Sequence, residues 1–206
     1  LGFACAVTSS AFAAPKPRLV AAAVELLGYE KNAAGRTAVR IGFDIPCGGA
    51  FYGLIAKGGA KGKLQVAALN EVGPVICTSL PERRELLVDY FATAAFKVMQ
   101  PMTVNRIRGR IRTVTANDLR VVRRKGRRSR LQAVAPATCG VPIGTVVRQN
   151  GKRLDIGFAE QLARGQSTRE CSNAQVVREI RELKVLPKTP VGSLAAYRAS
   201  GYGAKE

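Results

Sequence analysis

Histidine and tryptophan are both absent from the 206-residue sequence. Without histidine the chain cannot form a Ser-His-Asp or Cys-His catalytic group, and it lacks the commonest metal ligand. The Ser-x-x-Lys nucleophile motif and the phosphate-binding Gly-x-x-x-x-Gly-Lys-Ser/Thr loop are also missing. A carboxylate pair for glycoside hydrolysis is the remaining enzymatic alternative, but most acidic residues lie among arginines, as in Glu82-Arg83 and Arg178-Glu179. We therefore expect a non-catalytic protein with no cofactor and no metal.

Long apolar runs are missing as well, and no stretch of about 18 apolar residues could form a membrane-spanning helix. The first residues are uncharged and end in the small-x-small pattern Ala11-Phe12-Ala13, which is followed by Pro15-Lys16. This pattern is typical of a signal-peptide cleavage site, so we interpret Leu1–Ala13 as a truncated signal peptide. The alternatives are a buried apolar segment, or a lipoprotein signal at Cys5 preceded by a poor lipobox. We expect a periplasmic or secreted protein.

Cysteine is scarce, with five residues in the chain, and removal of the signal peptide leaves four. An even number of cysteines in an exported protein predicts disulfides. A redox or metal site is the alternative, but the chain has neither a Cys-x-x-Cys pair nor a histidine. Four cysteines permit three pairings, and an internal repeat selects Cys47–Cys77 together with Cys139–Cys171.

The repeat consists of similar features in the same order. A Cys-Gly pair at 47–48 is followed 30 residues later by the next cysteine, and a second pair at 139–140 is followed 32 residues later. A domain of this size is only marginally stable alone, and a disulfide closing a loop of about 30 residues adds roughly 3–4 kcal/mol. The repeat predicts a first domain at 18–102, a second domain at 103–188 and a flexible tail at 189–206.

Strands dominate the predicted secondary structure. Thr37–Ile45 alternates apolar and other residues with period 2, and 64–68 and 154–158 do the same. Glycine-rich and Asn-Gly turns at 58–62 and 149–151 predict hairpins. One short helix is expected after the second cysteine of each copy. The first is opened by Pro81-Glu82, and the second contains Val176, Val177, Ile180 and Leu183. We predict a mainly β chain, built from two tandem copies of a small disulfide-bridged β-sandwich or open barrel; an α+β roll is the alternative.

Basic residues are concentrated in the second half, with few acids among them between 103 and 153, and this sets the charge of the molecule. The formal net charge is +19. Residues 15–102 hold 11 Lys/Arg and 7 Asp/Glu, whereas residues 103–206 hold 22 Lys/Arg and 7 Asp/Glu. Asp118 is the single acid beside 14 basic residues between 103 and 153. Because the matching segment of the first copy, 30–36, is nearly neutral, folding does not require this excess.

Two segments concentrate the positive charge. One alternates arginine with other residues, so a strand would present all four guanidinium groups on one face; its arginines are Arg106, Arg108, Arg110 and Arg112. The other is predicted as a hairpin tip and contains Arg123, Arg124, Lys125, Arg127, Arg128 and Arg130. Guanidinium groups bind phosphate, sulfate and carboxylate oxygens in a fork. We expect an anion-binding face, with a solvated surface that binds nothing as the alternative.

No aromatic residue lies between Thr103 and Gly157, so nucleic-acid bases would find no stacking platform beside this face. Sequence-specific nucleic-acid binding is therefore not expected. The expected partner is an anionic envelope component, such as lipopolysaccharide, an acidic polysaccharide or another phosphate-bearing polymer, or else an acidic protein. The alternatives are a structural or assembly subunit of a cell-envelope complex and an inhibitor of a secreted hydrolase.

Overall fold

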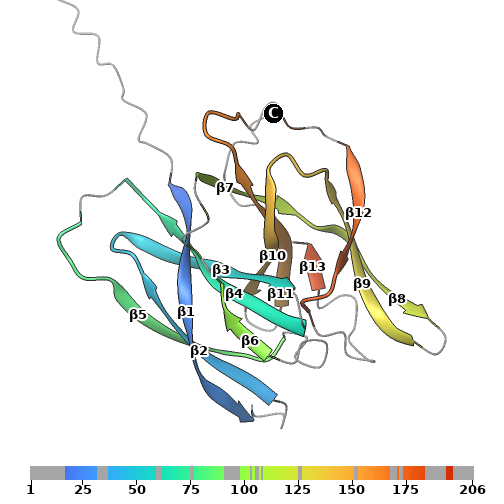
Figure 1. Ribbon diagram of the computed structural model, residues 1–206, viewed down its shortest axis with the longest axis horizontal. Helices are drawn as coiled ribbons and strands as arrows, with labels where there is room; N and C mark the ends of the chain where they lie inside the picture. Colours follow the sequence, from blue (N-terminus) through green and yellow to red (C-terminus); the bar gives the residue numbers. More distant parts are fainter. Residues whose placement is uncertain are drawn as a thin grey trace, which may run out of the picture.

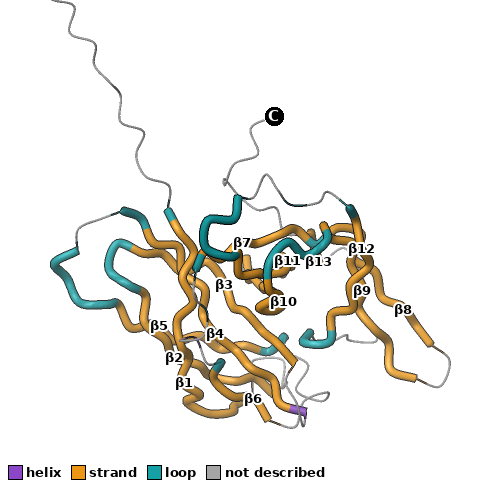
Figure 2. The backbone as a smooth tube through the Cα atoms, turned by 45° about the horizontal axis from the view of Figure 1, so that its top comes forward, coloured by secondary structure: helices purple, strands orange, loops and turns teal. Residues whose placement is uncertain are grey.

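The computed structural model describes residues 17–31, 37–58, 62–74, 77–90, 98–102, 104, 107, 109–124, 127–150, 153–167, 171, 174–183 and 194–196. This part of the chain is mainly β and contains no α-helix, which confirms the predicted class (Figures 1 and 2). The strands are β1 (Arg18–Lys31), β2 (Thr37–Ile45), β3 (Gly49–Gly58), β4 (Lys63–Val72), β5 (Glu82–Val88), β6 (Val98–Pro101), β7 (Arg110–Thr115), β8 (Asn117–Arg124), β9 (Arg127–Pro136), β10 (Val141–Asn150), β11 (Arg153–Leu162), β12 (Gln175–Ile180) and β13 (Leu194–Ala196).

A ten-stranded sheet forms most of the molecule. Its hydrogen-bonded order is β13-β11-β10-β3-β4-β1-β2-β5, with β6 beside β4 and β7 beside β11. A separate three-stranded sheet has the order β12-β9-β8. Both views place this small sheet at the opposite end of the molecule from β2 and β5 (Figures 1 and 2).

The first and second halves of the chain are joined where β3 pairs with β10. Glycine is required on both strands at this junction, because their backbones approach closely. A Cβ atom added to Gly144 would lie 2.5 Å from the carbonyl oxygen of Ala56, and one added to Gly53 would lie 2.8 Å from that of Val147. The antiparallel pairs are Leu54–Val147, Ile55–Val146 and Ala56–Thr145.

Strand β1 is long enough to pair with two neighbours. Its residues 18–23 pair with β4, and its residues 24–31 pair with β2. In the second half, the short strands β7 and β8 each pair with a single neighbour, β7 with β11 and β8 with β9. Near the break between β7 and β8, Asp118 has a φ of 47°, a left-handed conformation that interrupts regular extended backbone.

Two hydrophobic clusters fill the space around the central strands. The larger includes Phe43 from the first half and Leu131 from the second. The smaller lies on the other face of the central strands, around Tyr52, Ile55 and Val146, because successive residues of a strand point to opposite faces. Both clusters contain residues from each half, so the two halves share their cores.

The strands expected from alternation are confirmed. The structure has β2 at Thr37–Ile45, with Val39, Ile41 and Phe43 buried. The segments at 64–68 and 154–158 belong to β4 and β11. Both predicted hairpins are present, because β3 pairs with β4 and β10 pairs with β11 in antiparallel register.

The two predicted helices are wrong, because both segments are strands. The residues after Pro81 form β5 and pair with β2, and the residues around Val176 and Val177 form β12 and pair with β9. The spacing of apolar residues allowed a helix, but β-branched side chains favour a strand. Pairing then decided the outcome, since Ile180 lies opposite the buried Leu131.

Both disulfides form as predicted, Cys47–Cys77 and Cys139–Cys171. Such bridges persist in oxidising, extracellular-type compartments. Of the described residues, none forms a helix long and apolar enough to cross a membrane. The predicted signal peptide, 1–13, lies outside the described residues; within the predicted tail, Leu194–Ala196 forms β13 and pairs in parallel with β11.

Candidate anion-binding surface

The strongly basic segment around residue 125 is a β-hairpin, as predicted. Its strands, β8 and β9, pair in antiparallel register from Asn117–Val134 to Arg124–Arg127. The hairpin extends away from the rest of the molecule at the lower right of Figure 1. Lys125 lies outside the described residues, and for Arg123, Arg124, Arg127, Arg128 and Arg130 the structure describes the backbone alone. Their backbone positions concentrate five arginines on two adjacent strands.

No acidic residue follows Asp118 in the sequence until Asp155, so the hairpin carries no neutralising charge of its own beyond Asp118. The hairpin formed by β1 and β2 differs in this respect. There, Glu30 forms an ion pair with Arg40 across the two strands, at 2.7 Å. Lys31 donates a hydrogen bond to the hydroxyl of Thr37.

The predicted row of four arginines at 106–112 is not one exposed row. The strand begins only at Arg110, and Arg106 and Arg108 lie outside the described residues. Arg110 is exposed, but Arg112 is on the strand face that also carries Val114, a residue of the larger core. Residues 110, 112 and 114 do share one face, as the alternation predicts, but that face is exposed only at Arg110 and becomes covered towards Val114, which packs in the larger core.

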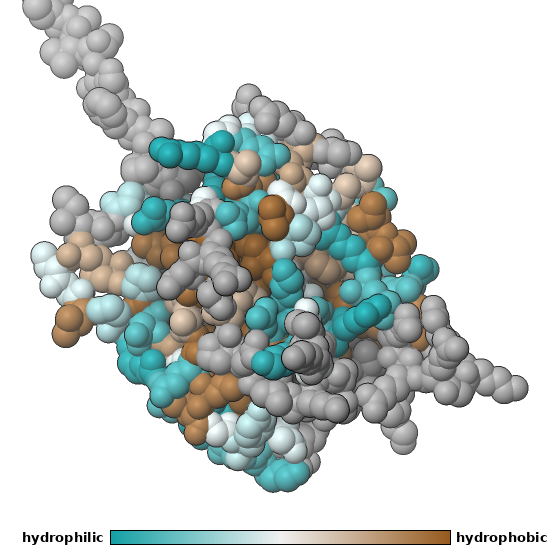
Figure 3. Space-filling model, in the orientation of Figure 1, coloured by the Kyte–Doolittle hydropathy of each residue, from teal (hydrophilic) through white to brown (hydrophobic). Residues whose placement is uncertain are grey.

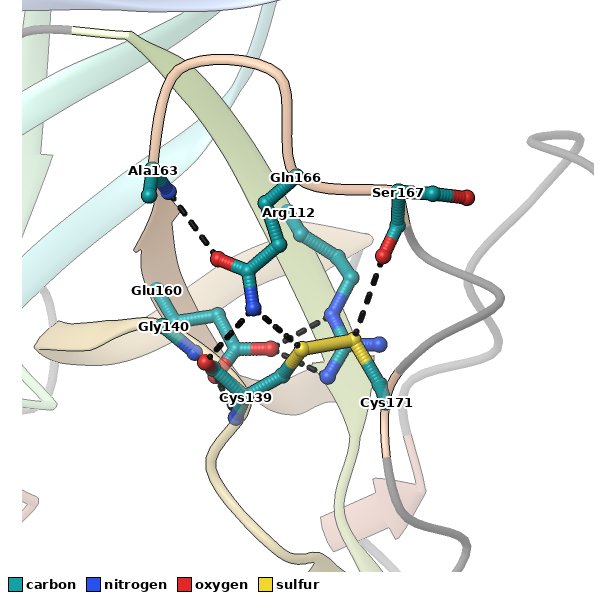
Figure 4. The surroundings of a disulfide bond; sticks show 8 residues. All are labelled: Arg112, Cys139, Gly140, Glu160, Ala163, Gln166, Ser167 and Cys171. Carbon is teal, nitrogen blue, oxygen red and sulfur yellow. Dashed lines mark hydrogen bonds and ion pairs between the residues drawn. A yellow bond between two sulfur atoms is a disulfide. The ribbon is translucent and has the colours of Figure 1, made fainter.

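Arg112 forms a buried ion pair with Glu160 of β11. The Arg112 side chain is 17% exposed and that of Glu160 3%, and both the Nε and Nη2 atoms of Arg112 contact Oε1 of Glu160. The second carboxylate oxygen accepts hydrogen bonds from the backbone N–H groups of Cys139 and Gly140, at 2.8 and 3.1 Å (Figure 4). This carboxylate therefore already neutralises Arg112 and anchors the loop of the second disulfide.

Gln166 completes this cluster. Its side-chain N–H group donates to the carbonyl oxygen of Cys139 at 3.1 Å, and its side-chain oxygen accepts from the backbone N–H of Ala163 at 3.1 Å (Figure 4). These bonds hold the turn after β11 against the disulfide. The cluster stabilises the fold, and its polar atoms point to one another.

Arg178 of β12 is a further arginine with a structural role. Its guanidinium lies over the ring of Phe158, 4.8 Å from the centroid, and donates to the carbonyl of Pro136 and the hydroxyl of Thr138. Burial lowers the pKa of Arg178; nearby Glu160 raises it and Arg112 lowers it. The guanidinium of Arg178 therefore makes its contacts within the protein and holds β12 against its neighbours.

The remaining predicted arginine, Arg110, lines a surface groove together with Arg18, which the sequence analysis missed. The groove has a volume of about 750 Å³ and lies where the first residues of β1 and β7 come together. Arg18 carried no signal in the sequence, because it belongs to no basic run like that at 123–130 and Arg110, which lines the same groove, is 92 positions away. No ion pair joins Arg18 or Arg110 to another described residue.

Beside the basic hairpin, β12 exposes apolar side chains. Val176 is 39% exposed and Val177 57% exposed, and Figure 3 shows hydrophobic side chains gathered over this strand. β12 is also one of the two edge strands of its sheet. An exposed apolar edge strand of this kind is a site where another protein can pair.

Comparisons with known proteins give no relative: no protein-family model, no curated protein and no solved structure matches this chain.

Proposed function

We propose that this protein is an exported, non-catalytic binding protein that holds an anionic polymer or an acidic partner through the β8–β9 hairpin. The observation that carries the proposal is the concentration of five arginines on two paired strands that project from the body of the molecule. Clustered like charge opposes folding. A partner that neutralises the cluster offsets this cost.

The chemistry favours recognition of charge density over recognition of sequence. Guanidinium groups bind phosphate and sulfate in two-pronged geometry. Each contact releases counterions from a polyanion, which makes affinity fall with salt. Aromatic residues, which would stack on bases, are absent from 103–157. An envelope polymer with phosphate or carboxylate groups fits this surface.

We also propose that the two halves are copies of one ancestral unit, and that the hairpin became basic in the second copy. Matching strand pairings support this: β1–β2–β5 corresponds to β8–β9–β12, and β3–β4 corresponds to β10–β11. β6 pairs in parallel with β4, and β13 pairs in parallel with β11. Each half also contains its own disulfide.

Retention on heparin across a salt gradient tests the binding function. The test variant carries Arg123→Gln, Arg124→Gln, Arg127→Gln and Arg128→Gln. We expect it to fold normally and to elute at lower salt, with the slope of log affinity against log salt reduced by about 3. The matched control removes four exposed arginines elsewhere: Arg83→Gln, Arg84→Gln, Arg164→Gln and Arg181→Gln. Equal losses in the two variants would mean that total charge, and not the hairpin, governs retention.

A second candidate function is an assembly subunit of an envelope complex, and the exposed Val176 and Val177 on the edge strand β12 favour it. The partner would then be held by apolar contact and strand pairing. A complex that survives high salt and is lost in Val177→Asn would support this function over polyanion binding.

A further inference from the structure

The groove at the start of β1 and β7 is formed by both halves of the chain. Its walls are Pro17–Ala21 on one side and Ile107 with Gly109–Ile111 on the other. β1 and β7 lie side by side, with Cα atoms within 8 Å of one another. No strand ladder joins these two strands among the described residues.

The lining has a polar and an apolar part. Arg18 and Arg110 are both exposed, and none of the described residues that line the groove is acidic. Leu19, Ile107 and Ile111 are apolar side chains that belong to, or pack against, the smaller core cluster. The lining thus combines two exposed guanidinium groups with apolar side chains of the smaller core; on an ordinary solvated surface, basic residues would be mixed with acids.

The two arginines occupy the same position in their respective strands. Arg18 is the first residue of β1 and lies opposite Val72, the last residue of β4. Arg110 is the first residue of β7 and lies opposite Leu162, the last residue of β11. The groove therefore receives one arginine from each half, and neither half alone would form it.

We propose that this groove binds a single-chain anionic amphiphile, such as a long-chain carboxylate, in a site that goes beyond the proposed polymer-binding function. The anionic headgroup would lie between Arg18 and Arg110, because two guanidinium groups can share one carboxylate. The alkyl chain would cover Leu19, Ile107 and Ile111. The volume of about 750 Å³ is within the range of small-molecule sites.

A hydrated polymer is a poor occupant, since it would bring no apolar group to Leu19, Ile107 and Ile111. Charge complementarity and these apolar lining residues together select a ligand with one charged end and one apolar end. No described residue of the β8–β9 hairpin lines the groove, so the two binding activities are separable.

Isothermal titration calorimetry with monomeric laurate tests the proposal. We expect laurate to bind the full chain, with acetate and the neutral amphiphile decyl maltoside binding at least about tenfold more weakly. Arg18→Gln and Arg110→Gln should each weaken laurate binding about tenfold, the loss expected for one charged hydrogen bond. The double variant should lose measurable binding. Hydrogen exchange should show protection at 18–21 and 109–111 when laurate is present.

Two controls separate this site from the hairpin. Arg164→Gln, an exposed arginine in a turn, should bind laurate like the wild type. The fourfold hairpin variant should lose heparin retention but keep laurate binding. The proposal is overturned if wild type binds no laurate, if acetate binds equally well, or if the Arg18→Gln/Arg110→Gln variant binds laurate normally. None of these outcomes bears on heparin retention, so failure of either proposal can be recognised separately.

Discussion

Arg112 on β7 and Glu160 on β11 lie opposite each other in register and form a buried ion pair. On β1, the residue two positions after the start of the strand is Val20, which lies opposite Asn70 of β4. The same offset carries a charged pair on β7 and β11 and a neutral pair on β1 and β4.

Arg112→Val should destabilise the protein by about 3 kcal/mol, because it leaves the Glu160 carboxylate buried without its counter-charge. Arg112→Val combined with Glu160→Gln should be within about 1 kcal/mol of wild type, since replacing both charges removes the desolvation cost of each. The glutamine oxygen can still accept from Cys139 and Gly140. Urea unfolding measures both variants.

The exposed ion pair of Arg83 with Glu25 and Asp44 provides the control. Arg83→Gln should change the urea midpoint little, because solvent screens such pairs. If Arg112→Val were as mild as Arg83→Gln, the pair would not be buried in solution. If the double variant were worse than the single one, the carboxylate would have a role beyond pairing with Arg112.

Gly144→Ala should cost about 1–3 kcal/mol, because the new Cβ would overlap the carbonyl oxygen of Ala56 at 2.5 Å. That oxygen belongs to the backbone of β3, so relief requires β3 and β10 to separate. Gly42→Ala is the matched strand control, since its Cβ would overlap the flexible, exposed end of Arg83, also at 2.5 Å, and otherwise meet the Leu27 side chain at 3.2 Å, with no backbone atom in the way. Urea unfolding should show a clear loss for Gly144→Ala and a smaller one for Gly42→Ala. Equal losses would mean that the β3–β10 junction is less tightly packed than described.

The sequence contains a signal for the burial of Glu160, which is its position in the alternation of β11. Alternation at Leu154, Ile156 and Phe158 predicted β11, and Glu160 continues the same phase by one more step. A carboxylate in the apolar phase of a strand needs a buried cation. The alternating arginines were correctly placed on one face between 110 and 112, but local alternation does not say whether that face is covered.

Local pattern predicted β2 with its observed bounds and the basic hairpin, because both depend on neighbours in the sequence. β5 and β12 were mistaken for helices, since their strand state depends on pairing with β2 and β9, which are distant in the chain. The groove between Arg18 and Arg110 could not be predicted for the same reason. Its two walls, at 17–21 and 107–111, come together only through the packing of β1 beside β7.

Removing either disulfide should cost about 3–4 kcal/mol, the chain-entropy value for loops closed over 30 and 32 residues. Cys47→Ala/Cys77→Ala and Cys139→Ala/Cys171→Ala test the two bridges separately by urea unfolding. Adding a reductant to wild type should lower stability by more than either variant alone. A loss well below 1 kcal/mol for either pair would indicate that the bridge does not restrict the unfolded chain.

The stability of the protein should decrease at alkaline pH, in part because of Tyr52. Burial raises the pKa of this phenol above 10.0; its hydrogen bond with Thr113 and the nearby Arg148 lower it, and Glu71 raises it. The phenol thus ionises more readily in the unfolded chain than in the folded protein. Its contribution to stability is full below pH 10 and declines above it by up to about 1.4 kcal/mol per pH unit.

Tyr52→Phe isolates this contribution. At neutral pH the variant should be less stable by about 0.5–1.5 kcal/mol, because it loses the hydrogen bond to Thr113, 3.2 Å away. Above pH 10 the difference should shrink, since phenylalanine has no proton to lose and escapes the alkaline loss. Tyr29→Phe, which removes a phenol that is 59% exposed, is the control for loss of a surface hydroxyl, and it should change the unfolding free energy at neutral pH little. If the stability difference between Tyr52→Phe and wild type stayed constant above pH 10, Tyr52 would be solvated in the folded protein. The contact that it makes between β3 and β7 would then be absent in solution.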